Sequence, residues 1–171
     1  VDFIIAIGGG SPMDAAKAIA LLSAQDISED DLFSGKYESK VLPMAFVPTT
    51  AGTGSEVTPY SILTNDKAQT KTSIASPLLF PAIAFLDSKY TKNLSLTTTI
   101  NTAIDALSHA VEGMLSIRAN AMTDIIAVQS IKLISECFDA LINNAFTDDV
   151  RDKLLYASML SGIVITHTGT T

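Results

Sequence analysis

The chain has 171 residues, which is enough for one domain of ordinary size or for parts of two. Its hydrophobic content of 47%, against 17% charged residues, indicates a globular protein with a core and excludes a disordered chain. The formal net charge of −7 argues against a nucleic acid or an anionic membrane surface as a partner. No apolar run approaches the roughly 18–20 residues that a membrane-spanning helix requires, so no membrane partner is expected.

The single cysteine and the two ends of the chain indicate where the protein works. Cys137 has no partner for an internal disulfide, which is typical of the reducing cytoplasm, and its apolar neighbours predict a small buried side chain. The chain opens at Val1 inside an apolar run, with neither an initiator methionine nor a signal-peptide pattern, and it closes on a loop-like segment over 168–171. We therefore expect a piece of a longer cytoplasmic protein.

The chain begins with a predicted strand, a glycine turn and a helix. Residues 3–7 form a continuous β-branched and apolar run, which predicts a strand covered on both faces in a parallel sheet. Gly8-Gly9-Gly10 follows at once, and residues 13–22 have the pattern of a helix. The three glycines remove every Cβ from the turn, so that a ligand can approach the backbone.

The residues after the glycines specify the start of this helix. Ser11 suits the N-cap, Pro12 suits the first helical position, and Asp14 completes an S-x-x-D capping pattern. A helix that starts at a glycine turn directs its free N–H groups and its positive end at that turn, which is how α/β proteins hold a pyrophosphate. The glycine spacing matches neither G-x-G-x-x-G nor the P-loop, and a tight turn before a capped helix explains the same residues without a ligand.

A second distinctive segment follows the next predicted strand, at 42–47. It reads Pro-Thr-Thr-Ala-Gly-Thr-Gly-Ser-Glu over residues 48–56, with four hydroxyl groups and two glycines. The carboxyl end of a parallel strand is where open α/β sheets bind ligands, and hydroxyl groups both donate and accept hydrogen bonds. The segment is a candidate for contacts to a phosphate, a sugar or a carboxamide, and a ligand-free loop is the alternative.

The remaining part of the first half is less specific. Residues 23–40 are polar and acidic, which predicts a surface loop or short helix. Residues 57–63 and 71–75 read as a hairpin around a polar turn, and Lys71 is either a phosphate or ribose ligand or a solvated lysine. Residues 82–86 predict a further buried strand that ends at Asp87.

From residue 91 onward the pattern becomes helical. A polar, threonine-rich connector over 91–99 is the expected domain boundary, so we divide the chain into an α/β part at 1–90 and a helical part at 91–171. Three helices are expected in the second part, over 98–116, 119–143 and 148–166.

One pair of polar residues in the helical part has metal-ligand spacing. Asp105 and His109 are four residues apart, so on a helix both side chains leave the same face, about one turn apart. A carboxylate oxygen and an imidazole nitrogen at this spacing can share a divalent cation. An ordinary Asp–His contact on a helix is the alternative.

Three segments together resemble the iron-containing (group III) alcohol dehydrogenases. They are Gly-Gly-Gly-Ser-Pro-x-Asp-x-x-Lys at 8–17, Pro-Thr-Thr-Ala-Gly-Thr-Gly-Ser-Glu-Val-Thr at 48–58, and Asp-Ala-Leu-Ser-His-Ala-Val-Glu at 105–112. Their order and spacing also fit, so the resemblance covers the chain from end to end.

The resemblance implies a partial Rossmann-like α/β nucleotide-binding domain followed by a partial all-α metal-binding domain. Asp105 and His109 match the first two of four metal ligands, with Fe²⁺ as the expected metal and Zn²⁺ possible. The cofactor, NAD or NADP, would contact residues in both halves of the α/β part: Gly9, Gly10, Ser11, Asp14, Thr49, Thr50, Thr53 and Lys71.

The activity that the resemblance implies is reversible hydride transfer between NAD(P)H and a small aldehyde or ketone, with the metal as Lewis acid. No catalytic residue beyond the metal site stands out in the sequence. The family also implies a homodimer or higher homo-oligomer. Two alternatives stay open: a related zinc enzyme, such as a polyol or glycerol dehydrogenase or a dehydroquinate synthase, and an inactive piece of the parent enzyme.

The chain departs from the family pattern at a few positions. Ala103-Ile104 stands where Gly-Met is usual, and Ser88 where a proline is common. The third and fourth ligands of the family are histidines that would follow Thr171. His167 precedes that position, so we expect it not to be a ligand.

Overall fold

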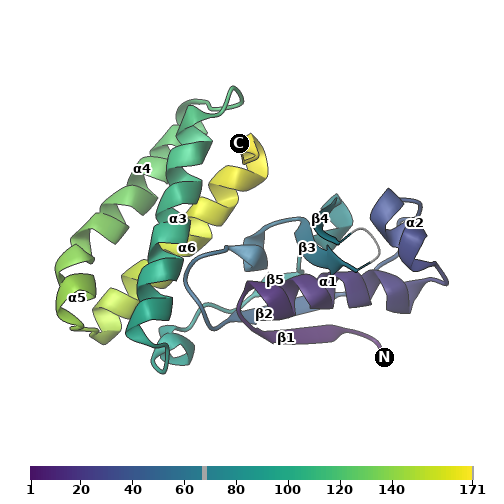
Figure 1. Cartoon of the computed structure of the whole chain (residues 1–171), viewed down its shortest axis with the longest axis horizontal. Coiled ribbons are helices and arrows are strands. Elements are labelled where there is room, and N and C mark those ends of the chain that lie inside the picture. The colour runs from purple at the N-terminus through teal and green to yellow at the C-terminus, as the bar shows by residue number, and fades with distance from the viewer. Residues whose placement is uncertain (67–68, 171) are drawn as a thin grey trace.

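The computed structural model describes residues 1–66 and 69–170, and the chain folds into two halves that lie side by side (Figure 1). The first half contains a parallel sheet of three strands in the order β1-β2-β5 and a separate antiparallel hairpin of β3 and β4. The second half consists of the helices α3 to α6. An α/β part followed by a helical part is the fold class that the sequence predicted.

The parallel sheet is built on β1 (Ile4–Gly8) and β2 (Met44–Pro48), which pair in register from Ile4 with Met44 to Gly8 with Pro48. The helix α1 (Gly10–Ala24) covers one face of this sheet. The core between them consists of buried side chains from all three elements: Ala6, Met13, Ala16, Ala20, Met44 and Phe46.

The prediction that both faces of the first strand are covered was wrong. Ile5 and Ile7 are 57% and 62% exposed, whereas Ala6 between them is buried. Successive side chains of a strand point to opposite faces of the sheet, and α1 covers only the face of Ala6. The predicted buried strand at 82–86 is also shorter and more exposed, because β5 spans Ile83–Ala84 only and Ile83 is 51% exposed.

The start of α1 also differs from the prediction. The helix begins at Gly10, Gly9 occupies the N-cap without a side-chain hydrogen bond, and Ser11 lies inside the first turn. The predicted capping pattern is therefore absent, and the Asp14 carboxylate accepts instead from the Ser55 hydroxyl and the backbone N–H of Ile62. Pro12 is tolerated at the third helical position because N–H groups in the first turn have no intrahelical partner.

The other elements of the α/β half follow the prediction closely. The short helix α2 (Glu29–Ser34) begins with a capping box between Ser28 and Asp31. The hairpin pairs β3 (Tyr60–Asn65) with β4 (Thr70–Ala75) in antiparallel register. Three single-turn 3₁₀ helices join the strands and lead into the helical half: η1 (Ser55–Val57), η2 (Pro77–Leu79) and η3 (Ser88–Thr91).

The helical half contains α3 (Leu96–Leu115), α4 (Ala121–Glu136), α5 (Phe138–Asn143) and α6 (Asp148–Thr168). The predicted helix over 119–143 is divided at Cys137, whose N–H donates to the carbonyl of Ile134, so that the chain tightens there. The Cys137 side chain is fully buried, as the sequence predicted. None of the helices within the described residues is long and apolar enough to span a membrane.

Small residues bring the two halves into direct contact. Gly54, in the threonine–glycine segment, lies against Gly162 of α6, so closely that a Cβ added to Gly54 would be 2.6 Å from the Gly162 Cα. Ala51 shares a core with Ala103 of α3, and the Thr166 hydroxyl donates to the carbonyl of Val57. The predicted cofactor segment is therefore docked on α6 and on α3, the helix that carries both predicted metal ligands.

Candidate functional site

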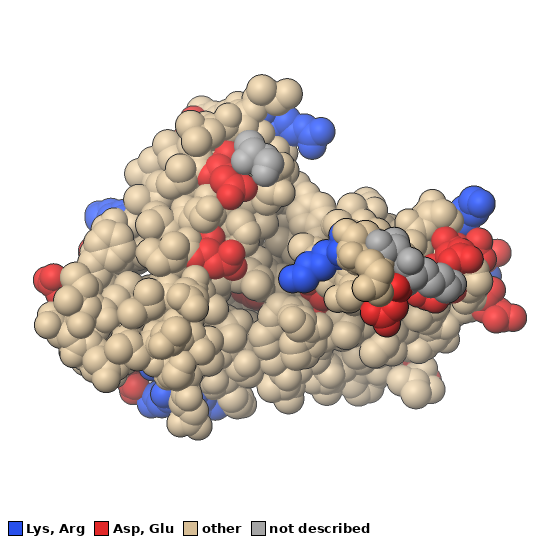
Figure 2. All heavy atoms as spheres, viewed as in Figure 1, with Lys and Arg blue, Asp and Glu red and all other residues tan. Residues whose placement is uncertain are grey.

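A cleft of about 570 Å³ lies between the two halves. Figure 2 shows the hollow, with acidic side chains on its helical side and a basic side chain on the opposite side. The lining residues come from α1, the chain over 53–58, the hairpin, α3, and the end of α6 with the two residues after it: Asp14, Thr53, Ser55, Thr58, Tyr60, Ile62, Lys71, Ser73, Asp105, His109, Ile165, Gly169 and Thr170.

The helical wall of the cleft carries the predicted metal pair. The Nε2 atom of His109 lies 3.9 Å from Oδ1 of Asp105, one helical turn away on α3. The His109 side chain is 19% exposed and that of Asp105 45% exposed, so both are accessible from the cleft. A separation of 3.9 Å leaves room for one cation between the two atoms at ordinary metal–ligand distances of about 2.0–2.2 Å.

The second ring nitrogen of His109, Nδ1, is buried and has no hydrogen-bond partner. Metal-ligating histidines usually donate from their second nitrogen to a carboxylate, a carbonyl or water, so this imidazole lacks the support that such a ligand has. Within residues 1–66 and 69–170, no group of three or more His, Cys, Asp or Glu side chains converges on one point. The pair therefore fits two ligands of a metal, and the remaining ligands must come from other groups.

The opposite wall is formed by Asp14 of α1 and by Ser55. The Ser55 hydroxyl donates to Oδ1 of Asp14 at 2.7 Å, and the backbone N–H of Ile62 donates to Oδ2 at 3.1 Å. Both carboxylate oxygens are thus held by the chain, and the side chain faces the cleft in a fixed orientation. Asp14, which the sequence predicted to contact the cofactor, therefore lines the same cleft as Asp105 and His109.

Two charged groups are buried behind this wall. Lys17 is fully buried, and burial lowers the pKa of its ammonium group to about 8, while Asp14 and Glu56 act in the opposite direction. Glu56 is 2% exposed, its Oε1 atom has no hydrogen-bond partner, and burial raises its pKa to about 7. Neither group lines the cleft.

One face of the hairpin, mostly polar, lines the cleft. Tyr60 and Ile62 are two residues apart on β3, and Lys71 and Ser73 are two residues apart on β4, so each pair lies on one face of its strand. Ile62 is paired with Ser73, so the two pairs share that face. Lys71, predicted as a cofactor contact, is exposed and stands on this face. The other lining residues of the hairpin were missed, although the two-residue alternation around Lys71 would have identified them.

The glycine turn lies beside the threonine–glycine segment, outside the residues that line the cleft. The backbone N–H of Thr49 donates to the carbonyl of Gly8, so the two loops leave the sheet together. Five of the predicted cofactor residues lie in these loops or in the first turn of α1 without lining the cleft, namely Gly9, Gly10, Ser11, Thr49 and Thr50.

The glycines of this turn leave space that neighbouring side chains occupy. A Cβ on Gly9 would lie 3.0 Å from the Thr50 hydroxyl oxygen, and one on Gly10 would lie 2.8 Å from the Thr53 methyl carbon. The threonines occupy the space that the glycines leave, so the two predicted segments are packed on each other. Close packing of the two loops thus favours glycine in this turn, independently of any ligand.

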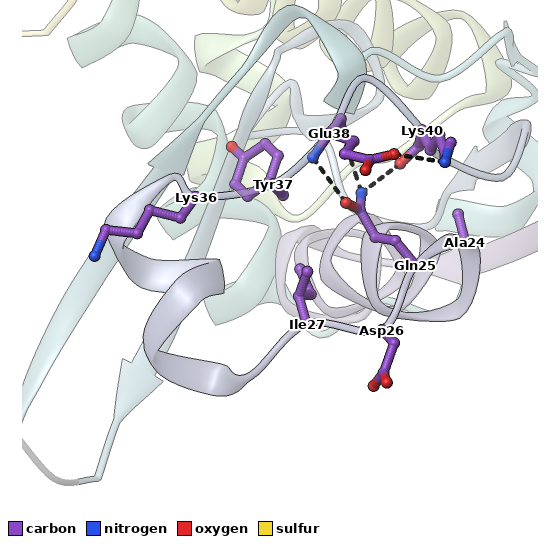
Figure 3. Close-up of a pocket in the computed structure, with 8 residues that line it drawn as sticks. All are labelled: Ala24, Gln25, Asp26, Ile27, Lys36, Tyr37, Glu38 and Lys40. Atoms are coloured by element: carbon purple, nitrogen blue, oxygen red, sulfur yellow. Dashed lines mark hydrogen bonds and ion pairs between the residues drawn. The ribbon is translucent and has the colours of Figure 1, made fainter.

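A second cavity, of about 500 Å³, lies at the carboxyl end of α1 (Figure 3). The Gln25 amide fills its polar side: it donates to the carbonyls of Glu38 and Lys40 and accepts from the N–H of Glu38. Glu38 and Lys40 also pair with each other. These groups satisfy one another, so the cavity is a structural feature of the loop that follows α2.

His167, which the sequence predicted not to be a ligand, lies on the exposed side of α6 and does not line the cleft. Its Nδ1 atom is 2.9 Å from the carbonyl of Ile163. The structure thus places His109, and not His167, beside Asp105.

Two family models match the chain. The model described as "Iron-containing alcohol dehydrogenase" matches residues 1–88, and the one described as "Fe-containing alcohol dehydrogenase family, C-terminal" matches residues 99–171. The NAD-dependent methanol dehydrogenase of Bacillus methanolicus is 34% identical over 170 residues, which are 98% of this chain and 44% of that protein. Long-chain-alcohol dehydrogenase 1 of Geobacillus thermodenitrificans is 36% identical over 98% of this chain and 43% of its own length.

Solved structures agree with these matches. An iron-containing alcohol dehydrogenase from Thermotoga maritima superimposes with a TM-score of 0.89 at 45% identity, over 99% of this chain and 46% of that one. Sulfoacetaldehyde reductase from Bifidobacterium kashiwanohense, solved in complex with NAD⁺, gives 0.94 at 37% identity, again over 99% and 46%. The chain spans less than half the length of these relatives. It belongs to the iron-containing alcohol dehydrogenase family.

Proposed function

We propose that the protein is a metal-dependent alcohol dehydrogenase that transfers a hydride reversibly between NAD(H) and a small alcohol or aldehyde. The observation that carries the proposal is one cleft that is lined both by the predicted metal pair and by three predicted cofactor residues, Asp14, Thr53 and Lys71. A hydride moves directly from one carbon to another, so cofactor and substrate must lie in contact in one cavity that excludes water.

Asp105 and His109 would hold the metal, with Fe²⁺ favoured by the family and Zn²⁺ as the alternative. When bound, the metal would polarise the substrate carbonyl and stabilise the alkoxide. The two residues differ in what they add: the carboxylate supplies negative charge that retains a divalent cation, and the imidazole supplies a nitrogen ligand. The proposal concerns the protein as its complete gene encodes it, because the described residues supply two ligands only.

The cofactor would lie against the α/β half. The N-terminus of α1 directs its free N–H groups toward the glycine turn, where Gly9, Gly10 and Ser11 would hold the pyrophosphate. Thr49, Thr50 and Thr53 would supply hydroxyl groups along the same wall, and Lys71 and Asp14 would contact the cofactor from the hairpin and from α1. The NAD⁺ complex of the sulfoacetaldehyde reductase and the NAD-dependent methanol dehydrogenase favour NAD over NADP.

The larger organisation is proposed on the same basis. We divide the chain into a nucleotide-binding part at 1–90 and a metal-binding part at 91–171, supported by the two family matches at 1–88 and 99–171. A homodimer or higher homo-oligomer is proposed from the family resemblance, and a cytoplasmic location from the single cysteine, which has no partner for an internal disulfide.

Substitution of the metal pair tests the proposal. In the protein expressed from its complete gene, Asp105→Ala and His109→Ala should each lower bound metal per chain and reduce alcohol oxidation by at least about a hundredfold, because each removes a metal ligand. Metal is measured by elemental analysis and turnover by NADH absorbance at saturating alcohol. His167→Ala is the matched control, since His167 lies outside the cleft, and it should leave both quantities unchanged.

Unchanged metal content in both Asp105→Ala and His109→Ala would contradict the assignment. The same metal analysis, with a panel of aldehydes, glycerol and a polyol, separates an iron alcohol dehydrogenase from a zinc polyol dehydrogenase. A protein that holds zinc and prefers glycerol would support the alternative within the same fold.

A further inference from the structure

The buried ammonium group of Lys17 links the elements that form one wall of the cleft, the wall that contains Asp14 and Ser55. Lys17 belongs to α1, and its Nζ atom donates to the Ser55 hydroxyl at 2.9 Å, the Thr58 hydroxyl at 3.4 Å and the Tyr60 carbonyl at 2.6 Å. An ammonium group has three N–H donors, and all three are used. The partners come from η1, the residue after it and the start of β3, so one side chain fixes three consecutive pieces of this wall to α1.

The contact with Ser55 also determines the direction of a hydrogen bond in the cleft. A serine hydroxyl has one hydrogen, and because the Ser55 oxygen accepts from Lys17, that hydrogen is free to point at Oδ1 of Asp14. The ammonium group itself lies 3.8 Å from the same carboxylate oxygen. Lys17 therefore acts on Asp14 twice, once through the Ser55 hydroxyl and once through its charge.

Lys17 cannot contact a ligand itself. Its side chain is fully buried and does not line the cleft, and the ring of Phe46 from β2 lies 5.9 Å from its Nζ atom on the core side. A buried ammonium group pays a desolvation cost that an apolar side chain would avoid. That cost is offset by what the lysine assembles, a wall in which Asp14 and Ser55 line the cleft.

We propose that Lys17 is a positioning residue for the cofactor: it fixes Asp14 and Ser55 in the cleft and thereby sets the affinity for NAD(H), without touching the cofactor. This inference rests on the proposed function. It makes Lys17 responsible for the geometry of one wall only, because the metal pair stands on α3, on the other side of the cleft. Loss of Lys17 should therefore weaken cofactor binding while metal binding persists.

Lys17→Met tests this in the protein expressed from its complete gene and loaded with metal. The dissociation constant of NADH, measured by its fluorescence, should rise about tenfold, with a parallel rise in the KM for NAD and unchanged metal per chain. Arg151→Met is the matched control, because Arg151 is also a buried cation, donates to Thr99 and lies away from the cleft. It should lower the melting temperature and leave the NADH dissociation constant within about twofold of the wild-type value.

A double-substitution cycle with Ser55→Ala separates positioning from general destabilisation. If Lys17 acts through Ser55, Lys17→Met should weaken NADH binding about tenfold in the parent protein and less than about threefold in the Ser55→Ala background. Should Lys17→Met not fold, Lys17→Gln, which retains a donor, carries the same cycle. Unchanged NADH affinity in the lysine variant, or strictly additive effects, would overturn the proposal.

The wild-type measurements distinguish this failure from failure of the proposed function. A wild-type protein that binds neither metal nor NADH removes the proposed function. A wild-type protein that oxidises alcohols, together with a Lys17→Met variant of normal NADH affinity and lowered melting temperature, removes only the positioning role.

Discussion

Burial shifts the pKa values of the two charged residues behind the cleft wall, Glu56 and Lys17, in opposite directions. Glu56 and Lys17 are both removed from water, and each is more easily accommodated in its neutral form. Burial raises the pKa of the Glu56 carboxyl to about 7 and lowers that of the Lys17 ammonium group to about 8. Between these values both side chains carry charge, so neutral pH is where their combined cost is largest.

The pKa shifts predict how the free energy of unfolding depends on pH. For Glu56, the folded protein keeps a proton that the unfolded chain has released between about pH 4.5 and 7, so stability should fall as pH rises through this window. For Lys17, the folded protein has lost a proton that the unfolded chain keeps between about pH 8 and 10.5, so stability should rise with pH there. The contribution of the pair is therefore smallest between about pH 7 and 8.

Urea unfolding of Glu56→Gln and Lys17→Met at pH 5, 7.5 and 10 checks this prediction. Relative to the wild type, Glu56→Gln should lose the acid-side dependence and keep the alkaline one, and Lys17→Met should do the reverse. Each variant is thus the control for the other. A Glu56→Gln profile that runs parallel to the wild type from pH 5 to 7.5 would show that the buried carboxyl is not responsible.

At the level of single residues, the sequence predicted which side chains share a site better than it predicted their local roles. The spacing of Asp105 and His109 correctly placed both on one helix face, because that relation is local. The Ser11 cap was wrong because α1 begins before it, with the Gly9 carbonyl accepting from the N–H of Met13. Asp14, the second half of the expected capping pattern, is bound instead by Ser55 and Ile62, which are distant in sequence. Lys17 was read only as part of a motif, since its three acceptors are brought together by the fold.

Among the elements, the threonine–glycine segment depends most on close approach. Gly54 has a positive φ of 59°, and a Cβ there would lie 2.6 Å from the Gly162 Cα of α6. Gly35 has a similar φ of 73°, but nothing lies within 4 Å of its added Cβ. The two glycines thus share the backbone strain that an alanine would suffer and differ only in crowding.

This pair predicts a difference that backbone strain cannot explain. Gly35→Ala should cost about 1 kcal/mol through the left-handed backbone alone. Gly54→Ala should cost a further ~1–3 kcal/mol, because its Cβ meets backbone atoms of α6 that cannot rotate away. Denaturant unfolding of both variants measures the difference, and equal losses would mean that the segment and α6 are not tightly docked.

Element boundaries were predictable where local signals acted and failed where tertiary contacts decided. The hairpin, α2 and the three helical regions followed from periodicity and turn residues. The shortness of β5 and the break at Cys137 had no signal in the sequence. An apolar run such as 82–86 also does not reveal whether anything covers its outer face.

At the scale of the whole molecule, the face of the parallel sheet that α1 leaves uncovered is an exposed apolar surface. Ile5 and Ile83 both pair with Ala45, one from each neighbouring strand, so they lie on one face in a row across the sheet. Ile7 follows Ile5 by two residues in β1, and Phe85 follows Ile83 by two residues just after β5; they are 62% and 55% exposed. A contiguous apolar face of this kind favours association or the binding of apolar molecules.

We therefore expect the 171-residue chain, prepared on its own, to bind an apolar fluorescent dye and to self-associate with increasing concentration. Ile5→Thr combined with Ile83→Thr should reduce both effects, because threonine keeps the β-branched shape that strands favour and has a hydroxyl in place of the apolar ethyl group of isoleucine. Ile142→Thr, at an exposed residue of α5 away from the sheet, is the control and should leave dye binding near its original level. Sedimentation at several concentrations and dye fluorescence give the two readings. If the double variant bound as much dye as the parent chain, the apolar surface that matters would lie on the helices and not on the sheet.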